Sequence, residues 1–402
     1  NIGNGIPATL SIGLGLSSEA YSQSYNYARV AIDLALARGG DQAVIKDCNG
    51  ITYYGGKRDQ TSRNTRVKAR VKAEALREFI TVKDKIFVMG HQLTDVDSFG
   101  AAIGIYRAAN ALEKRAYIVI NEVSASLKPL YTAYENNPDY PERLFLNSAE
   151  ALELADESSM VVVVDTNRPG MTECEELLHV AKTIVVLDHH RQSSDNIDNA
   201  LLSYIEPYAS SACEMVSEVL QYIVDDIKIP NLEASSLYAG IMIDTNNFMN
   251  KTGVRTFEAA AFLRRSGADI TLVRKMFRDD MESYRAKAQI ISSAEVYHNK
   301  YAIARGENLT IESPTIIGAQ AANELLDINE VKASFVLTTY NGRIYVSARS
   351  IDEVNVQIIM ERLGGGGHMN ASGAQFDHTD MDEAVADLKQ VIDDVIEGGE
   401  IE

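Results

Sequence analysis

Acidic and imidazole side chains follow apolar runs at four places in this chain of 402 residues. The four places are GHQLTDVDSF with His91, Asp95 and Asp97; VVVVD with Asp165; TIVVLDHHR with Asp188, His189, His190 and Arg191; and SLYAGIMID with Asp244. In a parallel sheet the loops beyond the carboxyl ends of the strands meet at one edge, where ligands gather. The sequence therefore predicts that these groups converge, and together they exceed the needs of one ion.

Each group taken singly also has a structural explanation. Asp97 before Ser98 fits a helix N-cap, Asp165 fits a turn residue, and Asp188 fits a strand-end carboxylate with a local hydrogen bond. The combination favours a metal site. Oxygen and imidazole ligands without thiolate suit manganese, with magnesium, cobalt or iron as alternatives. Two such ions about 3.5 to 4 Å apart activate water and neutralise charge on a phosphate.

Two other hydrolytic or phosphate-binding signatures are missing from the sequence. It contains neither a GxSxG nucleophile elbow nor a Walker loop GxxxxGK(S/T). We therefore expect hydrolysis without a covalent protein nucleophile.

A second candidate site lies far downstream at GGGGH, from Gly364 to His368. Glycines let backbone N–H groups approach an anion closely, and Arg349 in SARS offers a bidentate phosphate donor. A flexible loop that ends a helix is the structural alternative. If the loop binds substrate, we expect a side chain at Gly367 to block that approach while the fold and the metal site persist.

Strands and helices must bring these groups together. Short apolar runs at residues 85–90, 115–120, 160–165 and 183–188 alternate with amphipathic segments such as residues 98–112. This alternation predicts an α/β fold with a parallel sheet that helices cover on both faces.

The same patterns divide the chain into segments. Residues 84–270 form the predicted catalytic domain, and residues 297–402 form a smaller mixed α/β domain. Residues 271–296 are a predicted connecting helix. Residues 57–83 are charged, with Val67, Val71 and Leu76 at helical spacing, and predict a solvated linker helix. Residues 1–56 hold a strand, a helix and a short strand that ends in a turn at residues 49–56.

Composition narrows the choice of partner. The formal charge of −19 and the pI near 4.9 would repel long nucleic acid, whereas metal ions and local amides still allow a small anion to bind. The 3 cysteines have no CxxC spacing and predict neither a disulfide framework nor a thiolate metal site. No apolar run reaches the roughly 18 residues of a membrane span, and the first residues do not resemble a signal peptide, so we expect the chain as given to be soluble.

The ordered motifs HxxxDxD, VVVVDTN, LDHHR, GIMIDT and GGGGH resemble those of the DHH phosphoesterase superfamily with its DHH-associated C-terminal domain. The resemblance covers residues 84 to about 395. Residues 1–56 resemble the last third of a GGDEF-type domain, which narrows the similarity to the GdpP-type cyclic-di-AMP phosphodiesterases. Full-length members of that family are membrane-tethered and carry PAS and degenerate GGDEF domains upstream.

The resemblance implies a role for each motif. It implies one manganese on His91, Asp95 and Asp165, and a second on Asp97, Asp165, His189 and Asp244. It implies that Asp188 orients an imidazole and that His190 and Arg191 face the scissile phosphate. The residues implied to hold the distal phosphate and base are Arg349, Asn355, Gly366, Gly367 and His368. The implied reaction opens one phosphodiester of cyclic-di-AMP to linear pApA, in a dimer on the cytoplasmic side of the membrane.

Other functions share the same motifs. A nanoRNase for short oligonucleotides, a RecJ-type exonuclease and a manganese pyrophosphatase are the enzymatic alternatives. The acidic net charge disfavours the exonuclease hypothesis. The GGDEF-like segment disfavours the nanoRNase and the pyrophosphatase. A non-catalytic receptor for a cyclic dinucleotide is an alternative of another class, which the complete ligand set disfavours.

Overall fold

The computed structural model describes residues 10–17, 21–37, 42–48, 50–55, 61–190, 192, 195–249, 251–278, 280–307, 309–311, 313–351, 354–376 and 380–398. The chain divides into two compact units. One is Lys57–Arg278, and the other joins Asn1–Gly56 with Asp279–Glu402. Within the described ranges, no helix combines the length and the apolar character that a membrane span requires.

A parallel six-stranded sheet forms the centre of the unit Lys57–Arg278, in the order β6-β5-β4-β7-β8-β9. Its strands are β4 (Lys85–Met89), β5 (Arg115–Val119), β6 (Phe145–Leu146), β7 (Met160–Val164), β8 (Thr183–Asp188) and β9 (Leu202–Ile205). The predicted parallel sheet is confirmed. Because the strand order runs outward from β4 on one side and from β7 on the other, the topological switch lies between these two strands.

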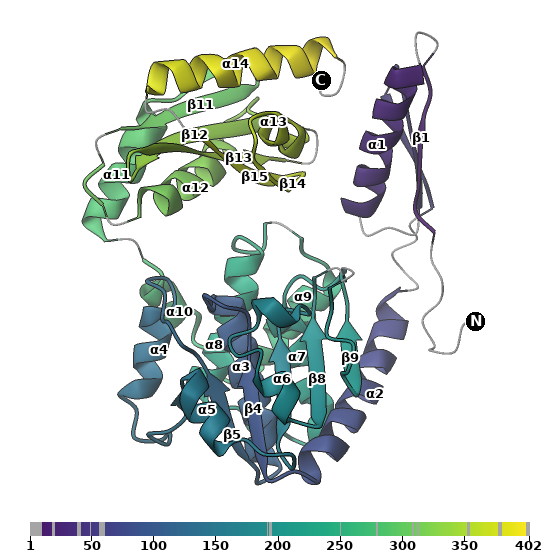
Figure 1. Cartoon of the computed structure of the whole chain (residues 1–402), viewed down its shortest axis with the longest axis vertical. Coiled ribbons are helices and arrows are strands. Elements are labelled where there is room, and N and C mark those ends of the chain that lie inside the picture. The colour runs from purple at the N-terminus through teal and green to yellow at the C-terminus, as the bar shows by residue number, and fades with distance from the viewer. Residues whose placement is uncertain are drawn as a thin grey trace. The chain divides into compact units, whose positions relative to one another are not determined.

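Helices cover both faces of this sheet (Figure 1). They are α2 (Thr61–Thr81), α3 (Val96–Ala111), α4 (Lys128–Glu135), α5 (Ser148–Leu154), η1 (Pro169–Met171), α6 (Leu177–Val180), α7 (Ala212–Ile223), α8 (Asn231–Asp244), α9 (Val254–Arg265) and α10 (Ile270–Met276). Val88 and Val162 pack on one face with Phe99 of α3, and Val163 packs on the other with Leu177 of α6. Burial of both faces explains why the strand sequences are continuously apolar.

The helix α2 is part of this unit and not the solvated linker that its charge predicts. Leu76 is 1% exposed, and Ala69, Ala73 and Ile80 are fully buried, whereas Val67 is 63% exposed. The buried face is therefore built on alanines, which let α2 approach α7 closely. Small residues carry little apolar signal, and for this reason the charged sequence predicted a solvated linker although Leu76 and these alanines are buried.

The other unit contains a mixed six-stranded sheet in the order β10-β11-β12-β13-β15-β14, in which only the pair β11 and β12 is parallel among the described strands. Its strands are β10 (Glu295–Tyr297), β11 (Tyr301–Gly306), β12 (Ala333–Tyr340), β13 (Arg343–Ser350), β14 (Gly366–His368) and β15 (Ala371–Phe376). The helices α11 (Met281–Ser292) and α12 (Pro314–Leu325) cover one face, and α13 (Val356–Arg362) and α14 (Met381–Glu397) cover the other. The predicted smaller mixed α/β architecture is confirmed.

A three-stranded sheet precedes the unit Lys57–Arg278 in the chain. Its elements are β1 (Ile12–Gly15), α1 (Tyr21–Ala37), β2 (Gln42–Asp47) and β3 (Gly50–Gly55). Residues 50–55 pair with β2 as an antiparallel strand, although the sequence predicts a turn there. The glycines of this segment favour a turn locally, but backbone hydrogen bonds to β2 make it a strand.

The sequence predicts one connecting helix over residues 271–296, but the structure has two separate helices there, α10 and α11, and then the start of β10. The side chain of Asp269 caps α10 and that of Asp280 caps α11. An N-cap starts a new helix because its side chain accepts from the otherwise unpaired first N–H groups. The boundary between the two units, after Arg278, falls between these helices.

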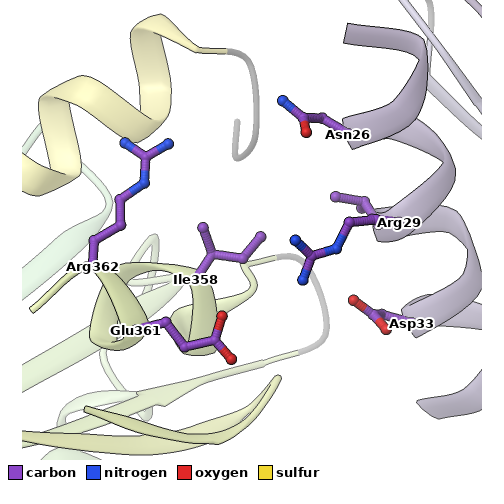
Figure 2. A pocket seen from close by; sticks show the side chains of 7 residues that line it. Asn26, Arg29, Asp33, Ile358, Glu361 and Arg362 are labelled. Atoms are coloured by element: carbon purple, nitrogen blue, oxygen red, sulfur yellow. The ribbon is translucent and has the colours of Figure 1, made fainter. Parts of the chain in front are cut away.

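One pocket of the unit that contains α1 and α13 is lined by charged residues of both helices (Figure 2). Arg29 and Asp33 come from α1, and Glu361 and Arg362 come from α13. The lining therefore carries both signs of charge.

Candidate metal centre

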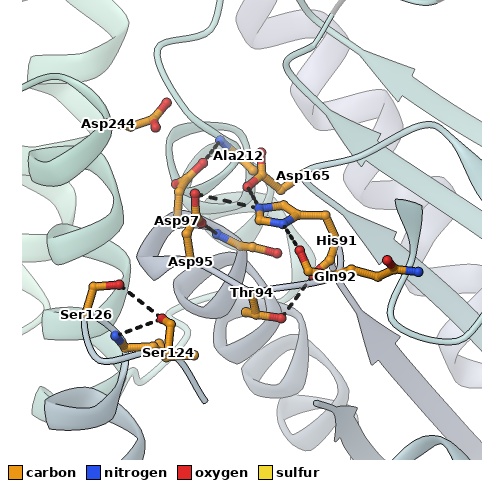
Figure 3. A network of polar contacts seen from close by, with 12 residues as sticks. His91, Gln92, Thr94, Asp95, Asp97, Ser124, Ser126, Asp165, Ala212 and Asp244 are labelled. Carbon is orange, nitrogen blue, oxygen red and sulfur yellow. Dashed lines mark hydrogen bonds and ion pairs between the residues drawn. The ribbon is translucent and has the colours of Figure 1, made fainter. Parts of the chain in front are cut away.

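His91 follows β4 and turns its ring toward two carboxylates (Figure 3). Its Nε2 lies 3.6 Å from Oδ2 of Asp95 and 3.5 Å from Oδ2 of Asp165. Its Nδ1 lies 2.8 Å from the carbonyl oxygen of Gln92. A carbonyl only accepts, so Nδ1 carries the hydrogen of this bond, and Nε2 is the nitrogen that faces the carboxylates.

Asp165 follows β7 and has a left-handed backbone, with φ of 61°. Its N–H donates to the carbonyl of Leu187 on β8 at 3.0 Å. While Oδ2 faces His91, Oδ1 lies 3.2 Å from Nε2 of His189. The two oxygens of this buried carboxylate therefore point to the imidazoles of two different strand ends.

Possible metal ligands gather in three groups, each with its donor atoms within 4.8 Å of one another. Two consist of predicted ligands, one of His91, Asp95 and Asp165 and the other of Asp97, His189 and Asp244. The third joins Asp165 and His189 with His190, which the sequence did not predict as a ligand. Nε2 of His189 lies 4.0 Å from Oδ2 of Asp97 and 3.7 Å from Oδ2 of Asp244. The structure thus brings together all six residues that the sequence selected as metal ligands.

Asp97 is held by the first turn of α7, a contact that the sequence did not reveal. Its Oδ2 accepts from the N–H of Ala212 at 2.7 Å, and its Oδ1 accepts from the N–H of Cys213 at 3.0 Å. The first N–H groups of a helix have no partner inside the helix. The sequence SACE predicts a helix start at Ser211, but no local signal shows which distant carboxylate its amides bind.

Asp188 is fully buried and contacts His190 rather than His189. Its Oδ1 lies 2.8 Å from Nδ1 of His190 and accepts from the N–H of the same residue at 3.0 Å. Asn167 donates to Oδ2 of Asp188 at 2.5 Å. The ring of His190 is therefore fixed by Asp188 although its side chain is 57% exposed. Arg191 lies outside the described residues.

The charged groups of the centre shift one another's pKa values strongly. Burial lowers the pKa of His91, but Asp165 and Asp95 outweigh this effect and raise the pKa to about 11. Burial likewise lowers the pKa of His189, and Asp165, Asp97 and Asp244 raise it to about 9. Burial and the neighbouring carboxylates raise the pKa of Asp97 well above its ordinary value. Such an acidic cluster is stabilised by positive charge.

The residues present fit a bound divalent cation. Oδ1 of Asp165 is buried and, within the described part of the chain, accepts no hydrogen bond of regular geometry, although Nε2 of His189 lies 3.2 Å away. A buried acceptor without a donor is rare, because it retains its desolvation penalty. Carboxylates and imidazoles are the ligands that manganese and related hard-to-borderline ions prefer.

The predicted substrate residues lie in the other unit, on β13, β14 and the start of α13. Burial lowers the pKa of the Arg349 guanidinium, which donates to the carbonyl of Ala348 at 2.9 Å. No carboxylate of the described residues forms an ion pair with Arg349. Asn355 caps α13 by accepting from the N–H of Gln357 at 3.1 Å.

The glycine segment is part of a hairpin and not only a loop. Gly366 and Gly367 belong to the edge strand β14, which pairs antiparallel with β15. A Cβ at Gly367 would lie 2.6 Å from Cα of Ser372, whereas a Cβ at Gly366 would meet nothing within 4 Å. The expectation that a side chain at Gly367 leaves the fold unchanged is therefore wrong, because it would collide with β15. The side chain of His368 lies outside the described residues.

Two sequence profiles match the chain. The profile of the DHH family, N-terminal domain, matches residues 85–241, and that of the DHHA1 domain matches residues 309–397. The chain is 41% identical over 392 residues to cyclic-di-AMP phosphodiesterase PdeA of Listeria monocytogenes, covering 96% of this chain and 59% of that protein. It is 41% identical over 401 residues to cyclic-di-AMP phosphodiesterase GdpP of Bacillus subtilis, covering 98% and 61%. The chain thus spans about three fifths of the length of these relatives.

More distant relatives are named differently. A bifunctional oligoribonuclease and PAP phosphatase NrnA of Mycoplasma genitalium is 29% identical, over 72% of this chain and 88% of that protein. Among solved structures, an exopolyphosphatase-related protein from Bacteroides fragilis matches with a TM-score of 0.66 and 21% identity, over 81% of this chain and 96% of that one. This likeness concerns the fold alone. The chain carries a DHH domain over residues 85–241, followed by a DHHA1 domain over residues 309–397.

Proposed function

We propose that this chain is a metal-dependent phosphodiesterase that hydrolyses cyclic-di-AMP to linear pApA. The single observation that carries the proposal is the pair of ligand groups that share Asp165 as a neighbour at the switch between β4 and β7. The relatives named cyclic-di-AMP phosphodiesterases, at 41% identity over nearly all of this chain, support the choice of substrate.

We assign the two groups to two manganese ions. His91, Asp95 and Asp165 would hold one ion, and Asp97, His189 and Asp244 with Asp165 would hold the other. When bound, the two ions activate water and neutralise charge on the phosphate. The α7 amides donate to both carboxylate oxygens of Asp97 and so hold the carboxylate in place beside its group. Asp188 fixes the ring of His190, which is exposed enough to donate to a phosphate oxygen.

The second unit supplies the other binding groups in this proposal. Arg349 is half-buried, and no carboxylate of the described residues forms an ion pair with it. Such a guanidinium is suited to an anionic ligand. The strand register places Arg349 opposite Ala371, and Ala371 opposite His368, in one row across β13, β15 and β14. We assign the distal phosphate and base to Arg349, Asn355, Gly366, Gly367 and His368.

The remaining assignments follow the relatives and the sequence pattern. We propose that residues 1–56 are the end of a GGDEF-like domain, and that 84–270 and 297–402 are the catalytic and substrate-binding domains. We also propose a homodimer on the cytoplasmic side of the membrane, tethered by segments outside this chain. A protein of onion yellows phytoplasma, 34% identical over 98% of this chain and 47% of its own length, is named a membrane protein-large ribosomal subunit bL9 fusion protein.

A second candidate function is the hydrolysis of short linear oligonucleotides. The 29% identity to a protein named an oligoribonuclease and PAP phosphatase favours it. Cyclic-di-AMP, pApA and a short oligoadenylate should be compared at equal concentration on one manganese-replete preparation, with products resolved by chromatography. The proposal predicts fastest loss of cyclic-di-AMP and accumulation of pApA. Faster cleavage of the linear substrates would assign the chain to the second function, and tight binding without cleavage would make it a receptor.

A further inference from the structure

Glu173 is a buried carboxylate that accepts three hydrogen bonds from two neighbouring strand ends. Its Oε1 accepts from Oγ1 of Thr94 at 2.8 Å. Its Oε2 accepts from the backbone N–H of Asn121 at 3.2 Å and from Nδ2 of the same residue at 2.6 Å. No lysine or arginine of the described residues forms an ion pair with it. Within the described part of the chain, these hydrogen bonds to its carboxylate thus come from the uncharged Thr94 and Asn121.

The backbone around Glu173 is hydrogen-bonded to the loop that carries His91. The N–H of Glu173 donates to the carbonyl of Gly90 at 3.0 Å, and the N–H of Gln92 donates to the carbonyl of Met171 at 2.7 Å. Residues 91 and 172 form an antiparallel bridge. The hydroxyl of Thr94 also lies 3.2 Å from the carbonyl of His91. Residues 171–173 thus act as a short strand against the beginning of the loop from His91 to Asp95.

The loop needs such support because its own backbone is not regular. Leu93, in its middle, has a φ of 56°, in the left-handed region that leucine rarely adopts. The left-handed conformation of an ordinary residue persists only where the surroundings fix it. Thr94 is 2% exposed and stands between Leu93 and Asp95, so its bond to Glu173 fixes the turn immediately before a ligand.

We propose that Glu173 is a positioning residue for one of the two metal sites, that of His91, Asp95 and Asp165. The inference rests on the proposed function, since it assigns a role within that metal centre. Glu173 contacts the loop of His91 and Asp95, whereas Asp97 of the other site is held by the amides of α7. Loss of Glu173 therefore weakens the binding of the ion at His91, Asp95 and Asp165 and leaves the binding of the other ion unchanged.

The test is a calorimetric titration of chelator-treated protein with Mn²⁺. Glu173→Ala leaves the donors of Thr94 and Asn121 without their acceptor, and we expect one of the two ions to bind about 10 to 100-fold more weakly. Glu173→Gln should bind close to wild type, because its amide can donate to Thr94 while its oxygen accepts from Asn121. Thr94→Val removes only the hydroxyl and should give the same selective loss, smaller in size, if Glu173→Ala does not fold.

A matched control separates positioning from general destabilisation. Glu233 is also buried, pairs with Arg107 at 2.6 Å, and lies at the opposite end of α8 from Asp244. Glu233→Ala should lower stability and leave both ions unchanged.

Asp95→Asn identifies the affected site. Asp95→Asn should weaken the binding of the same manganese ion as Glu173→Ala does. The double variant Asp95→Asn with Glu173→Ala should still bind the second ion with wild-type affinity. Equal weakening of both ions, or unchanged binding in Glu173→Ala, would overturn the assignment while leaving the metal centre intact. A wild-type protein that binds no manganese would overturn the metal centre and this role together.

Discussion

Oδ1 of Asp165 lies 3.2 Å from Nε2 of His189, although the two residues follow different strands of the sheet. The other oxygen of Asp165 faces His91. This double contact depends on the left-handed backbone of Asp165, whose φ is 61°. Asp and Asn enter that region more readily than other residues with a Cβ. Position 165 therefore requires both a carboxylate and a backbone conformation that few residues tolerate.

Asp165→Asn tests the shared carboxylate without disturbing the backbone, because asparagine also tolerates the left-handed region. We expect the variant to fold and to lose both manganese ions and nearly all turnover, since the charge that faces both groups is gone. Metal content by mass spectrometry and thermal unfolding measure the two effects. Asp225→Ala, at an exposed position, is the control. Two ions still bound to Asp165→Asn would disprove the bridging role.

Gly240→Ala tests the support of Asp97. A Cβ there would lie 2.4 Å from Sγ of Cys213 and 2.9 Å from Oδ1 of Asp97, so the carboxylate or the start of α7 must shift. We expect manganese to bind the group of Asp97 about ten-fold or more weakly, as for other residues that orient ligands.

Gly104→Ala is the matched control for that variant. Its Cβ would lie 2.4 Å from Cγ1 of Val216 in the core, so it should cost about 1 to 3 kcal/mol of stability by overpacking. Its metal binding should stay normal. If Gly104→Ala and Gly240→Ala weaken manganese equally, the contact at Asp97 has no special role.

Gly366→Ala tests the glycine strand as a substrate contact. Its Cβ would meet no atom within 4 Å, so the hairpin should keep its stability. If the edge strand receives the substrate, turnover of cyclic-di-AMP should fall severalfold or more, while hydrolysis of bis(p-nitrophenyl) phosphate and manganese binding persist. Gly367→Ala should instead destabilise the domain, because its Cβ collides with β15 and its φ is 143°. Unchanged cyclic-di-AMP turnover in Gly366→Ala would place the substrate elsewhere.

Leu76→Ala tests whether α2 belongs to the core of the catalytic unit. Leu76 is 1% exposed, and the truncation should lower the free energy of unfolding by about 2 to 5 kcal/mol. Val67 on the same helix is 63% exposed, and Val67→Ala should change the free energy of unfolding by about 0.5 kcal/mol or less. Denaturant titration of both variants measures the difference. Equal, small effects would mean that α2 is a solvated connector after all.

The sequence predicted the parts of the molecule that depend on local pattern. Continuous apolar runs identified the buried parallel strands, and the acidic and imidazole residues that end them are indeed close together. This success has a physical basis, because the carboxyl ends of parallel strands meet at one edge. The order of the strands, and hence the switch between β4 and β7, does not follow from the pattern alone.

The contacts that the sequence did not reveal connect residues far apart in the chain. The amides of Ala212 and Cys213 bind Asp97 more than a hundred residues upstream, and Glu173 binds Thr94 and Asn121. Only the folded chain creates these pairs. The buried face of α2 was missed for another reason, since its alanines resemble surface residues in a charged helix.

The most direct test of the proposed chemistry is the conversion of cyclic-di-AMP by protein stripped of metal with a chelator. We predict no product from the stripped protein, and formation of pApA once Mn²⁺ is added in excess of the chelator. Asp165→Asn, treated in the same way, should form none. Full conversion of cyclic-di-AMP by wild-type protein in excess chelator would contradict a metal-dependent centre at His91, Asp97, Asp165 and His189.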